Sequence, residues 1–184
     1  MEEKKGLGYF IRITFTLLGI AAVMAFALAA VNAATKDKIE ENNLAEMNAV
    51  IEKIFGDGIE STEFAADAAE PVKEIYSISR NGDFQGWAVK CSPMGFKGNI
   101  EMIVGVLPDG SCKAVRIISH TETPGLGARV EEDPFLSQFD GTSGGLEVKV
   151  NIAEVAGATI SSRAVTNAVN AAIEAVSAIG GEDA

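Results

Sequence analysis

Cysteine and histidine are scarce in this sequence, and their scarcity argues against several classes of redox and metal site. There are two cysteines, Cys91 and Cys112, which stand 21 positions apart, and one histidine, His120. No Cys-x-x-Cys pair is present, which argues against a zinc ribbon, an attached haem and a cysteine-ligated cluster. A single histidine cannot by itself make a metal centre, and a Ser/His/Asp triad would leave no histidine to spare.

Basic residues are also few. The chain has 15 lysines and arginines against 26 acidic residues, for a net charge of −11 and a pI near 4.5. This balance argues against nucleic-acid binding, because little is available to neutralise phosphates. The 184 residues suffice for one domain with an appendage, and the 47% hydrophobic and 22% charged content is typical of a globular chain.

A long uncharged run near the N-terminus predicts a membrane segment. Residues 13–35 contain no charged side chain. As a helix they would extend about 35 Å at ~1.5 Å per residue, enough to cross a hydrocarbon core of about 30 Å. The alternative is a cleaved signal peptide, with Lys4, Lys5 and Arg12 as its basic region and AVNAA as its cleavage site. The length of the run favours an uncleaved anchor.

Flanking charges predict the orientation of this anchor. Three basic residues precede the run, whereas Lys36 and Lys38 follow it among acidic neighbours. This bias places the N-terminus inside, and the remainder, with 12 basic and 24 acidic residues, outside. The predicted order is a cytoplasmic segment, a transmembrane helix, a helical connector and an extracytoplasmic domain, over residues 1–12, 13–35, 36–70 and 71–184.

The part after the anchor shows helical and strand patterns in turn. Apolar residues recur at helical spacing over residues 37–55, and Gly56-Asp57-Gly58 ends that helix. Residues 61–71 are small and acidic, which predicts a loop or short helix. Short runs rich in valine, isoleucine and aromatic residues, separated by turns, predict antiparallel strands. They cover residues 74–79, 86–91, 100–107 and 113–119, with 146–151 as a candidate fifth strand.

The C-terminal segment predicts one more helix. Apolar residues from Ala164 to Ile179 form a single face, with Ser161 or Ser162 as the N-cap and Gly180-Gly181 as the end. The predicted fold class is therefore α+β, with one antiparallel sheet packed with helices after an N-terminal transmembrane helix.

Two irregular stretches are candidates for chemistry. Residues 119–128, SHTETPGLGA, follow a predicted strand, and their glycines would let the backbone approach a flat or anionic ligand. Residues 155–163, VAGATISSR, precede the last helix, whose N-terminus would stabilise a phosphate. Taken separately, the first stretch equally suits a tight turn, and the second suits a plain N-cap.

Together the two stretches resemble one family, the FMN-binding domain found in the G subunit of the Rnf electron-transport complex. The C subunit of the Na⁺-translocating NADH:quinone reductase is a related member. The matching segments are HTETPGLGARV, AGATISSRAV, the strand region and the single apolar span, over residues 120–130, 156–165, 86–110 and 13–35. The order and spacing of these segments carry the resemblance.

The resemblance implies a covalently bound cofactor. In that family a flavin transferase joins the phosphate of FMN to the threonine of the Gly-Ala-Thr element, which implies Thr159 here, one FMN per chain, and Ser161 as a second candidate. The other implied cofactor-binding residues are Glu122, Thr123, Pro124, Gly125, Leu126, Gly127, Gly157 and Ala158. The chain departs from the family pattern at Ala156, where serine or threonine is usual, and at Glu154, where aspartate is common.

The resemblance also implies a function. It predicts a membrane flavoprotein subunit of an Rnf-type ferredoxin:NAD oxidoreductase, with other membrane and peripheral subunits as partners and Na⁺ or H⁺ translocation as the coupled process. Such a subunit needs no acid–base residues of its own, because the flavin carries the electrons. Two alternatives stay open: an anchored extracytoplasmic structural or binding module without a redox group, and a reductase of a related FMN-binding family.

Four single residues receive simpler predictions. We expect Trp87 to pack in the fold rather than stack on a flavin. His120 is as consistent with a hydrogen-bonded loop histidine as with a place near the flavin. Cys91 and Cys112 fall on neighbouring predicted strands, where a disulfide is open to them, and reduced thiols are the default expectation.

Overall fold

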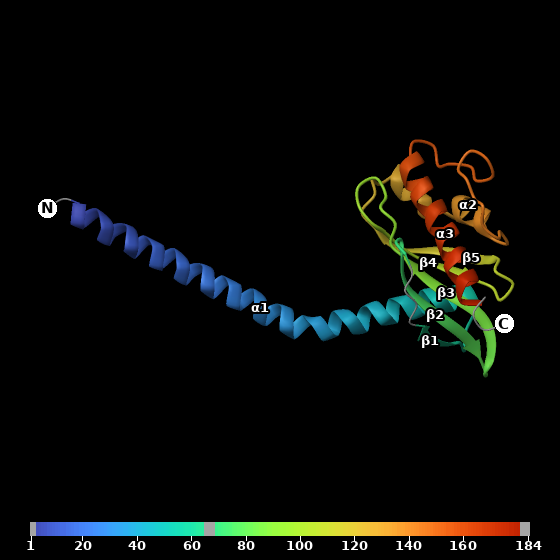
Figure 1. The fold of residues 1–184 in the computed structure, drawn as a ribbon, viewed down its shortest axis with the longest axis horizontal. Coiled ribbons are helices and arrows are strands. Elements are labelled where there is room, and N and C mark those ends of the chain that lie inside the picture. The colour runs from blue at the N-terminus through green and yellow to red at the C-terminus, as the bar shows by residue number, and fades with distance from the viewer. Residues whose placement is uncertain (1–2, 65–68, 181–184) are drawn as a thin grey trace. The chain divides into compact units, whose positions relative to one another are not determined.

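The chain forms two compact units, Met1–Ala45 and Glu46–Ala184, and the computed structural model describes residues 3–64 and 69–180. The first unit is the N-terminal part of helix α1 (Glu3–Phe55) (Figure 1). Within it, residues 9–36 have a mean hydropathy of 2.3 and expose their side chains along the whole stretch. This stretch contains the predicted span and is long and apolar enough to cross a membrane.

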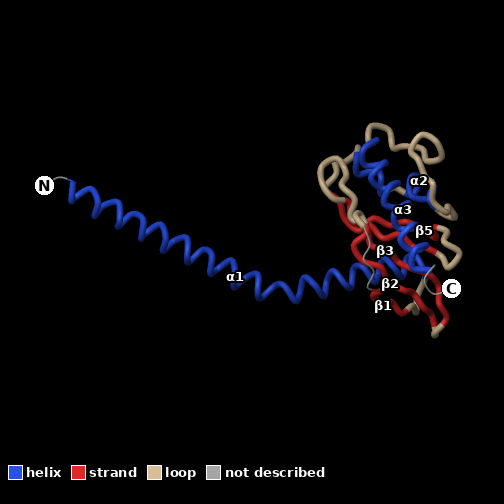
Figure 2. The backbone as a smooth tube through the Cα atoms, in the orientation of Figure 1, coloured by secondary structure: helices blue, strands red, loops and turns tan. Residues whose placement is uncertain are grey.

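The second unit is built on a five-stranded antiparallel sheet whose strands lie side by side in chain order (Figure 2). The strands are β1 (Glu60–Phe64), β2 (Val72–Arg80), β3 (Asp83–Cys91), β4 (Ile100–Val106) and β5 (Cys112–His120). The last four confirm the strands predicted from the sequence, with each end displaced by at most three residues.

The prediction of a fifth strand over residues 146–151 is wrong. The chain there makes turns, and its only strand-like feature is a single parallel bridge between Val148 and Ile152. Leu146 and Val148 are buried while Glu147 and Lys149 are exposed. The alternation of apolar and charged residues therefore reflects alternating burial in a turn, where no neighbouring strand pairs with the segment. Alternating burial alone does not fix a segment as a strand.

The fifth strand is instead β1, which the sequence predicted to be part of a loop or short helix over residues 61–71. All five residues of β1 are exposed, so they lack the alternation by which a half-buried strand is recognised. β1 pairs with β2 from Glu60, opposite Ser79, to Phe64, opposite Ile75. Residues 65–68 of the predicted loop lie outside the described residues.

Helices cover both faces of the sheet. Helix α3 (Thr159–Gly180) lies against one face of the sheet (Figure 1). Its apolar side chains pack there with Val89, Met102, Val104 and Val115. The last turns of α1 pack on the other face, where Ile51 and Ile54 join a cluster with Tyr76, Ile78, Ala88 and Ile103. Gly105 permits this close approach, because a Cβ there would lie 2.5 Å from Cγ2 of Ile54.

The end of α1 is held by a specific contact with the sheet. The helix ends at Phe55, as the following glycine predicted, and Nη2 of Arg80 donates a hydrogen bond of 2.6 Å to the Phe55 carbonyl. A cation at this position satisfies one of the free carbonyls of the helix and is stabilised by the helix dipole.

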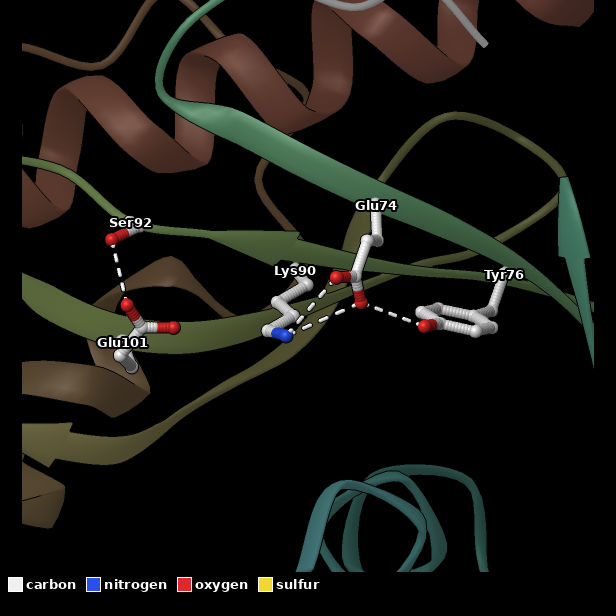
Figure 3. A network of polar contacts seen from close by, with 5 residues as sticks. All are labelled: Glu74, Tyr76, Lys90, Ser92 and Glu101. Carbon is white, nitrogen blue, oxygen red and sulfur yellow. Dashed lines mark hydrogen bonds and ion pairs between the residues drawn. The ribbon is translucent and has the colours of Figure 1, made fainter. Parts of the chain in front are cut away.

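A polar network lies beside the α1 turns on the same face of the sheet (Figure 3). The Tyr76 hydroxyl donates to Glu74 at 2.7 Å, and Nζ of Lys90 lies 3.2 Å from each Glu74 oxygen. Ser92 donates separately to Glu101 at 2.8 Å. Burial, reinforced by Glu74, raises the pKa of the Tyr76 phenol above its ordinary value, so this hydroxyl stays a hydrogen-bond donor.

The segment between β5 and α3 closes one end of the core. It contains η1 (Gly127–Glu131), α2 (Asp133–Leu136) and η2 (Ser137–Phe139). Val130, Phe135, Leu136 and Phe139 are buried in the α3-side cluster. Trp87 is also structural, as expected, because its ring packs edge-on against Phe64 and Phe84 with centroids 5.3 and 5.2 Å away.

The two cysteines are buried free thiols, and their predicted placement on neighbouring strands is wrong. Cys91 lies in β3 and Cys112 in β5, with β4 between these strands. They also sit near opposite ends of β4, because Cys91 pairs with Met102 and Cys112 with Val106.

We expect both thiols to resist alkylation in the folded protein. Burial raises the pKa of each to about 12, so at about pH 8 both stay protonated, and the thiolate is the reactive form. Mass spectrometry after iodoacetamide treatment should find no modification of the native chain and two modifications after denaturation. Rapid labelling of the native chain would contradict the burial described here.

Candidate functional site

The site is organised around Glu122, a buried carboxylate just after β5. Only 5% of this residue is exposed. Its Oε1 accepts hydrogen bonds from the backbone N–H groups of Phe96 at 2.7 Å and Lys97 at 3.1 Å, and its Oε2 accepts one from the Ser161 hydroxyl at 2.9 Å. A buried carboxylate is tolerated when its oxygens are hydrogen-bonded in this way. Glu122 therefore ties the loop before β4 to the start of α3.

Two glycines make room for this carboxylate. An ideal Cβ at Gly95 would lie 2.3 Å from Oε1 of Glu122, and one at Gly127 would lie 2.4 Å from Oε2. These distances are far inside van der Waals contact. Gly127 was predicted from the sequence to let the backbone approach a ligand. In the structure it is required because a side chain there would clash with Glu122.

Helix α3 begins at Thr159, three or four residues earlier than an N-cap at Ser161 or Ser162 predicted. Ser162 N–H donates to the Ala158 carbonyl at 2.8 Å, which starts the helical ladder. Ser161 and Ser162 are both buried inside the first turn, and the Ser162 hydroxyl accepts from Val155 N–H at 3.1 Å. The N-cap prediction is therefore wrong, because these hydroxyls bind Val155 and Glu122 instead of the free N–H groups at the start of the helix.

The turn before α3 depends on Gly157. Its φ of +79° is a conformation that residues with a side chain rarely adopt, and a Cβ there would lie 2.8 Å from Cδ1 of Leu126. Ala158 N–H closes the turn on the Val155 carbonyl at 2.9 Å. As a result Thr159 is partly exposed at the helix N-terminus, where the first N–H groups lack partners within the helix.

Glu154 and Lys149 stand beside the Thr159 hydroxyl. Nζ of Lys149 lies 3.1 Å from Oε1 of Glu154. The Thr159 hydroxyl, and after it Lys149, lowers the pKa of the Glu154 carboxyl below its ordinary value. Oε2 of Glu154 is buried and accepts no hydrogen bond of good geometry from the described residues, although the Thr159 hydroxyl lies near enough to affect its pKa. Glu154, which departs from the family's aspartate, thus keeps a carboxylate at Thr159.

These segments surround an open cavity of about 300 Å³. It is lined by Phe96, Glu122, Thr123, Leu126, Gly127, Gly157, Ala158, Thr159, Ile160 and Ser161. Most of the predicted site residues are therefore brought together at one place. Among them Gly125 and Pro124 do not line the cavity, and Gly125 serves the turn with a φ of +73°.

Two lining residues were missed by the sequence analysis. Phe96 lies in the 86–110 region and Ile160 in the Gly-Ala-Thr segment, and both regions carry the family resemblance, but neither residue received a predicted role. His120 is the last residue of β5 and is hydrogen-bonded: its Nδ1 accepts from Glu122 N–H at 3.3 Å, and its Nε2 lies 3.2 Å from Glu131.

The cavity has the chemistry that FMN needs. Phe96, Leu126 and Ile160 offer an apolar surface to a flat ring system. The first turn of α3 offers backbone N–H groups and the positive end of the helix dipole to a phosphate. Thr159 places a hydroxyl at this same helix end, so the residues present fit both parts of the cofactor.

Comparison with known proteins shows that this site lies in an FMN-binding domain. The FMN-binding domain family matches residues 95–174, which include every residue that lines the cavity. The fold is similar to the crystal structure of Shewanella oneidensis NqrC, with a TM-score of 0.53 and 18% identity over 82% of this chain and 98% of that one. The chain therefore carries an FMN-binding domain with an NqrC-like fold.

Relatives of known name narrow the class. The G subunit of the Na(+)-translocating ferredoxin:NAD(+) oxidoreductase complex of Acetobacterium woodii is 32% identical, over 95% of this chain and 97% of the relative. The G subunit of the ion-translocating oxidoreductase complex of Shewanella piezotolerans is 33% identical, over 85% and 84%. The chain belongs to this family, the G subunits of ion-translocating oxidoreductase complexes, which confirms the resemblance found in the sequence.

Proposed function

We propose that this chain is the membrane-anchored flavin subunit of a ferredoxin:NAD oxidoreductase complex that translocates Na⁺ or H⁺. In this proposal an FMN, one per chain, is joined by its phosphate to the hydroxyl of Thr159. The observation that carries it is the position of Thr159, which opens α3 at the edge of the apolar cavity and is partly exposed there.

The competing attachment residue, Ser161, is less suited to modification. Ser161 is fully buried, and its hydroxyl is already used by Glu122. The Thr159 hydroxyl instead stands beside Glu154, whose carboxyl has its pKa lowered by this hydroxyl and therefore stays ionised, so it can orient the hydroxyl as a hydrogen-bond acceptor. These differences favour Thr159.

The residues around Thr159 would hold the phosphate and the ring in different ways. The N–H groups of the first turn of α3 would face the anionic oxygens of the phosphate. Phe96, Leu126 and Ile160 would exclude water from one side of the ring system. The cofactor supplies the electron-transfer chemistry when it is bound, so the chain needs only to orient it.

The place of the chain in the complex follows from its family. Its partners in this proposal are the other membrane and peripheral subunits, together with a flavin transferase for maturation. The apolar part of α1 anchors it in the cell membrane by a single span, with the N-terminus in the cytoplasm and the flavin domain on the outer face. One relative is named Na⁺-translocating and another, from Clostridium ljungdahlii, proton-translocating, so the proposal names both ions.

We expect purified chain, produced together with a flavin transferase, to be yellow and to stay yellow after denaturation and washing. Intact-mass measurement should show an increase equal to one FMN less one water. Peptide mapping should place this increase on the segment that contains Thr159. A colourless chain of unmodified mass, matured in the same way, would support an anchored structural module instead.

A further inference from the structure

We infer that the flavin ring packs against the Phe96 side chain, and that Glu122 holds Phe96 at a fixed position relative to Thr159. The inference rests on the proposed function and deepens it, because it assigns a binding role to a residue outside both sequence motifs. The Phe96 side chain is unusually exposed for an aromatic residue. Phe96 is 66% exposed and belongs to neither hydrophobic cluster formed by the described residues.

The loop that presents Phe96 is closely hydrogen-bonded. Gly95 N–H donates to the Gly98 carbonyl at 2.8 Å, and Met94 and Asn99 form an antiparallel bridge. The backbone N–H of Phe96 itself is bound to Glu122 at 2.7 Å. An exposed aromatic residue on so constrained a loop has little freedom to fold back onto the core, so it gains no burial from the chain itself.

The same carboxylate that binds the Phe96 backbone also binds α3. Oε2 of Glu122 accepts from Ser161, two residues beyond Thr159 in the first turn of the helix. One buried side chain therefore links the residue that would carry the phosphate to the residue that would contact the ring. Neither contact requires Glu122 to touch the cofactor, so we assign it a positioning role.

Two further lining residues extend the apolar surface of the cavity. Leu126 is 47% exposed and Ile160 is 53% exposed, and both line the cavity with Phe96. Exposed apolar side chains that converge on one concave site are typical of a ligand-binding surface. Flat aromatic ring systems pack favourably on a phenyl ring in offset or edge-on geometry. An attached flavin would thus cover the three side chains that the fold leaves uncovered.

The test uses tryptophan as a distance-sensitive quencher, because an indole in contact with an excited flavin donates an electron to it and suppresses its fluorescence. Phe96→Trp and Met94→Trp would each be made in the full chain, matured with the flavin transferase. Met94 is the matched control, because it lies in the same loop and is 70% exposed but does not line the cavity. We expect Phe96→Trp to lower the fluorescence per bound flavin several-fold and Met94→Trp to change it little.

A second measurement covers a poorly folded tryptophan variant. In Phe96→Ala the covalent flavin should be retained, while iodide should quench its fluorescence several-fold more efficiently than in Met94→Ala. Equal behaviour of the position-96 and position-94 variants, with flavin attached to all of them, would overturn the inference and leave the proposed function intact. A wild-type chain that carries no flavin would overturn both.

Discussion

Replacing Thr159 by alanine is expected to remove the covalent flavin completely. The phosphoester needs a hydroxyl, and the first turn of α3 offers a partly exposed one at the cavity edge, on Thr159. Thr159 is the first residue inside α3, and alanine is the best helix former, so the domain should stay folded. After co-production with the flavin transferase, denatured Thr159→Ala should show no flavin fluorescence and an unmodified intact mass.

Two other variants make this result specific. Thr159→Ser keeps a hydroxyl in the same place and should retain a substantial part of the flavin. Ser161→Ala removes the buried hydroxyl that donates to Glu122 and should leave covalent attachment in place. If Ser161→Ala were colourless after denaturation while Thr159→Ala stayed yellow, the attachment residue would be Ser161.

Glu122→Ala is expected to have the largest effect on stability of the substitutions at the site. It leaves the Phe96 and Lys97 N–H groups and the Ser161 hydroxyl without their acceptor. The Ser161 hydroxyl is fully buried, and leaving such a donor unpaired costs about 1–3 kcal/mol in the free energy of unfolding. The midpoint of thermal unfolding of the full chain in detergent should fall by several degrees, and flavin incorporation should fall with it.

Glu122→Gln separates geometry from charge. The glutamine oxygen can accept from both N–H groups, and its amide can donate to Ser161, whose hydroxyl then acts as acceptor. We therefore expect Glu122→Gln to unfold close to the wild-type temperature and to incorporate flavin with an unchanged absorption spectrum. A glutamine variant as impaired as the alanine variant would show that the negative charge, rather than the hydrogen bonds, is what the site requires.

Where local pattern decides the fold, the sequence predicted it well. Strands β2 to β5, helix α3 and the last turns of α1 are recognisable from their runs or periodic faces of apolar side chains, and the rest of α1 from its long uncharged run. The strand at Glu60–Phe64 was not predicted, because a fully exposed edge strand has no alternation of buried and exposed residues. Residues 146–151 were wrongly predicted as a strand, because buried leucine and valine alternate there with charged residues in a turn.

The site was predictable to the extent that it lies in two contiguous segments. The residues after β5 and the residues before α3 each carry a recognisable motif, and their order along the chain identified the family. The third contributor, Phe96, sits in a separate loop, and its relation to Glu122 exists only after the sheet has formed. Ser161 was misplaced as a cap for a similar reason, since its partner, Glu122, lies 39 positions away. Ser162 was misplaced because the turn before α3 brings the Val155 N–H back to its hydroxyl.

The meander order of the sheet has a consequence for how the domain acquires its site. Each strand pairs with its neighbour in the chain, so the sheet can grow by successive short-range hairpins, which form quickly. Glu122 also joins Ser161, 39 positions away in α3, and this long-range contact forms only when α3 packs beside the sheet. We therefore expect a time window during refolding in which the strands are already protected from hydrogen exchange while the cofactor pocket is still unassembled.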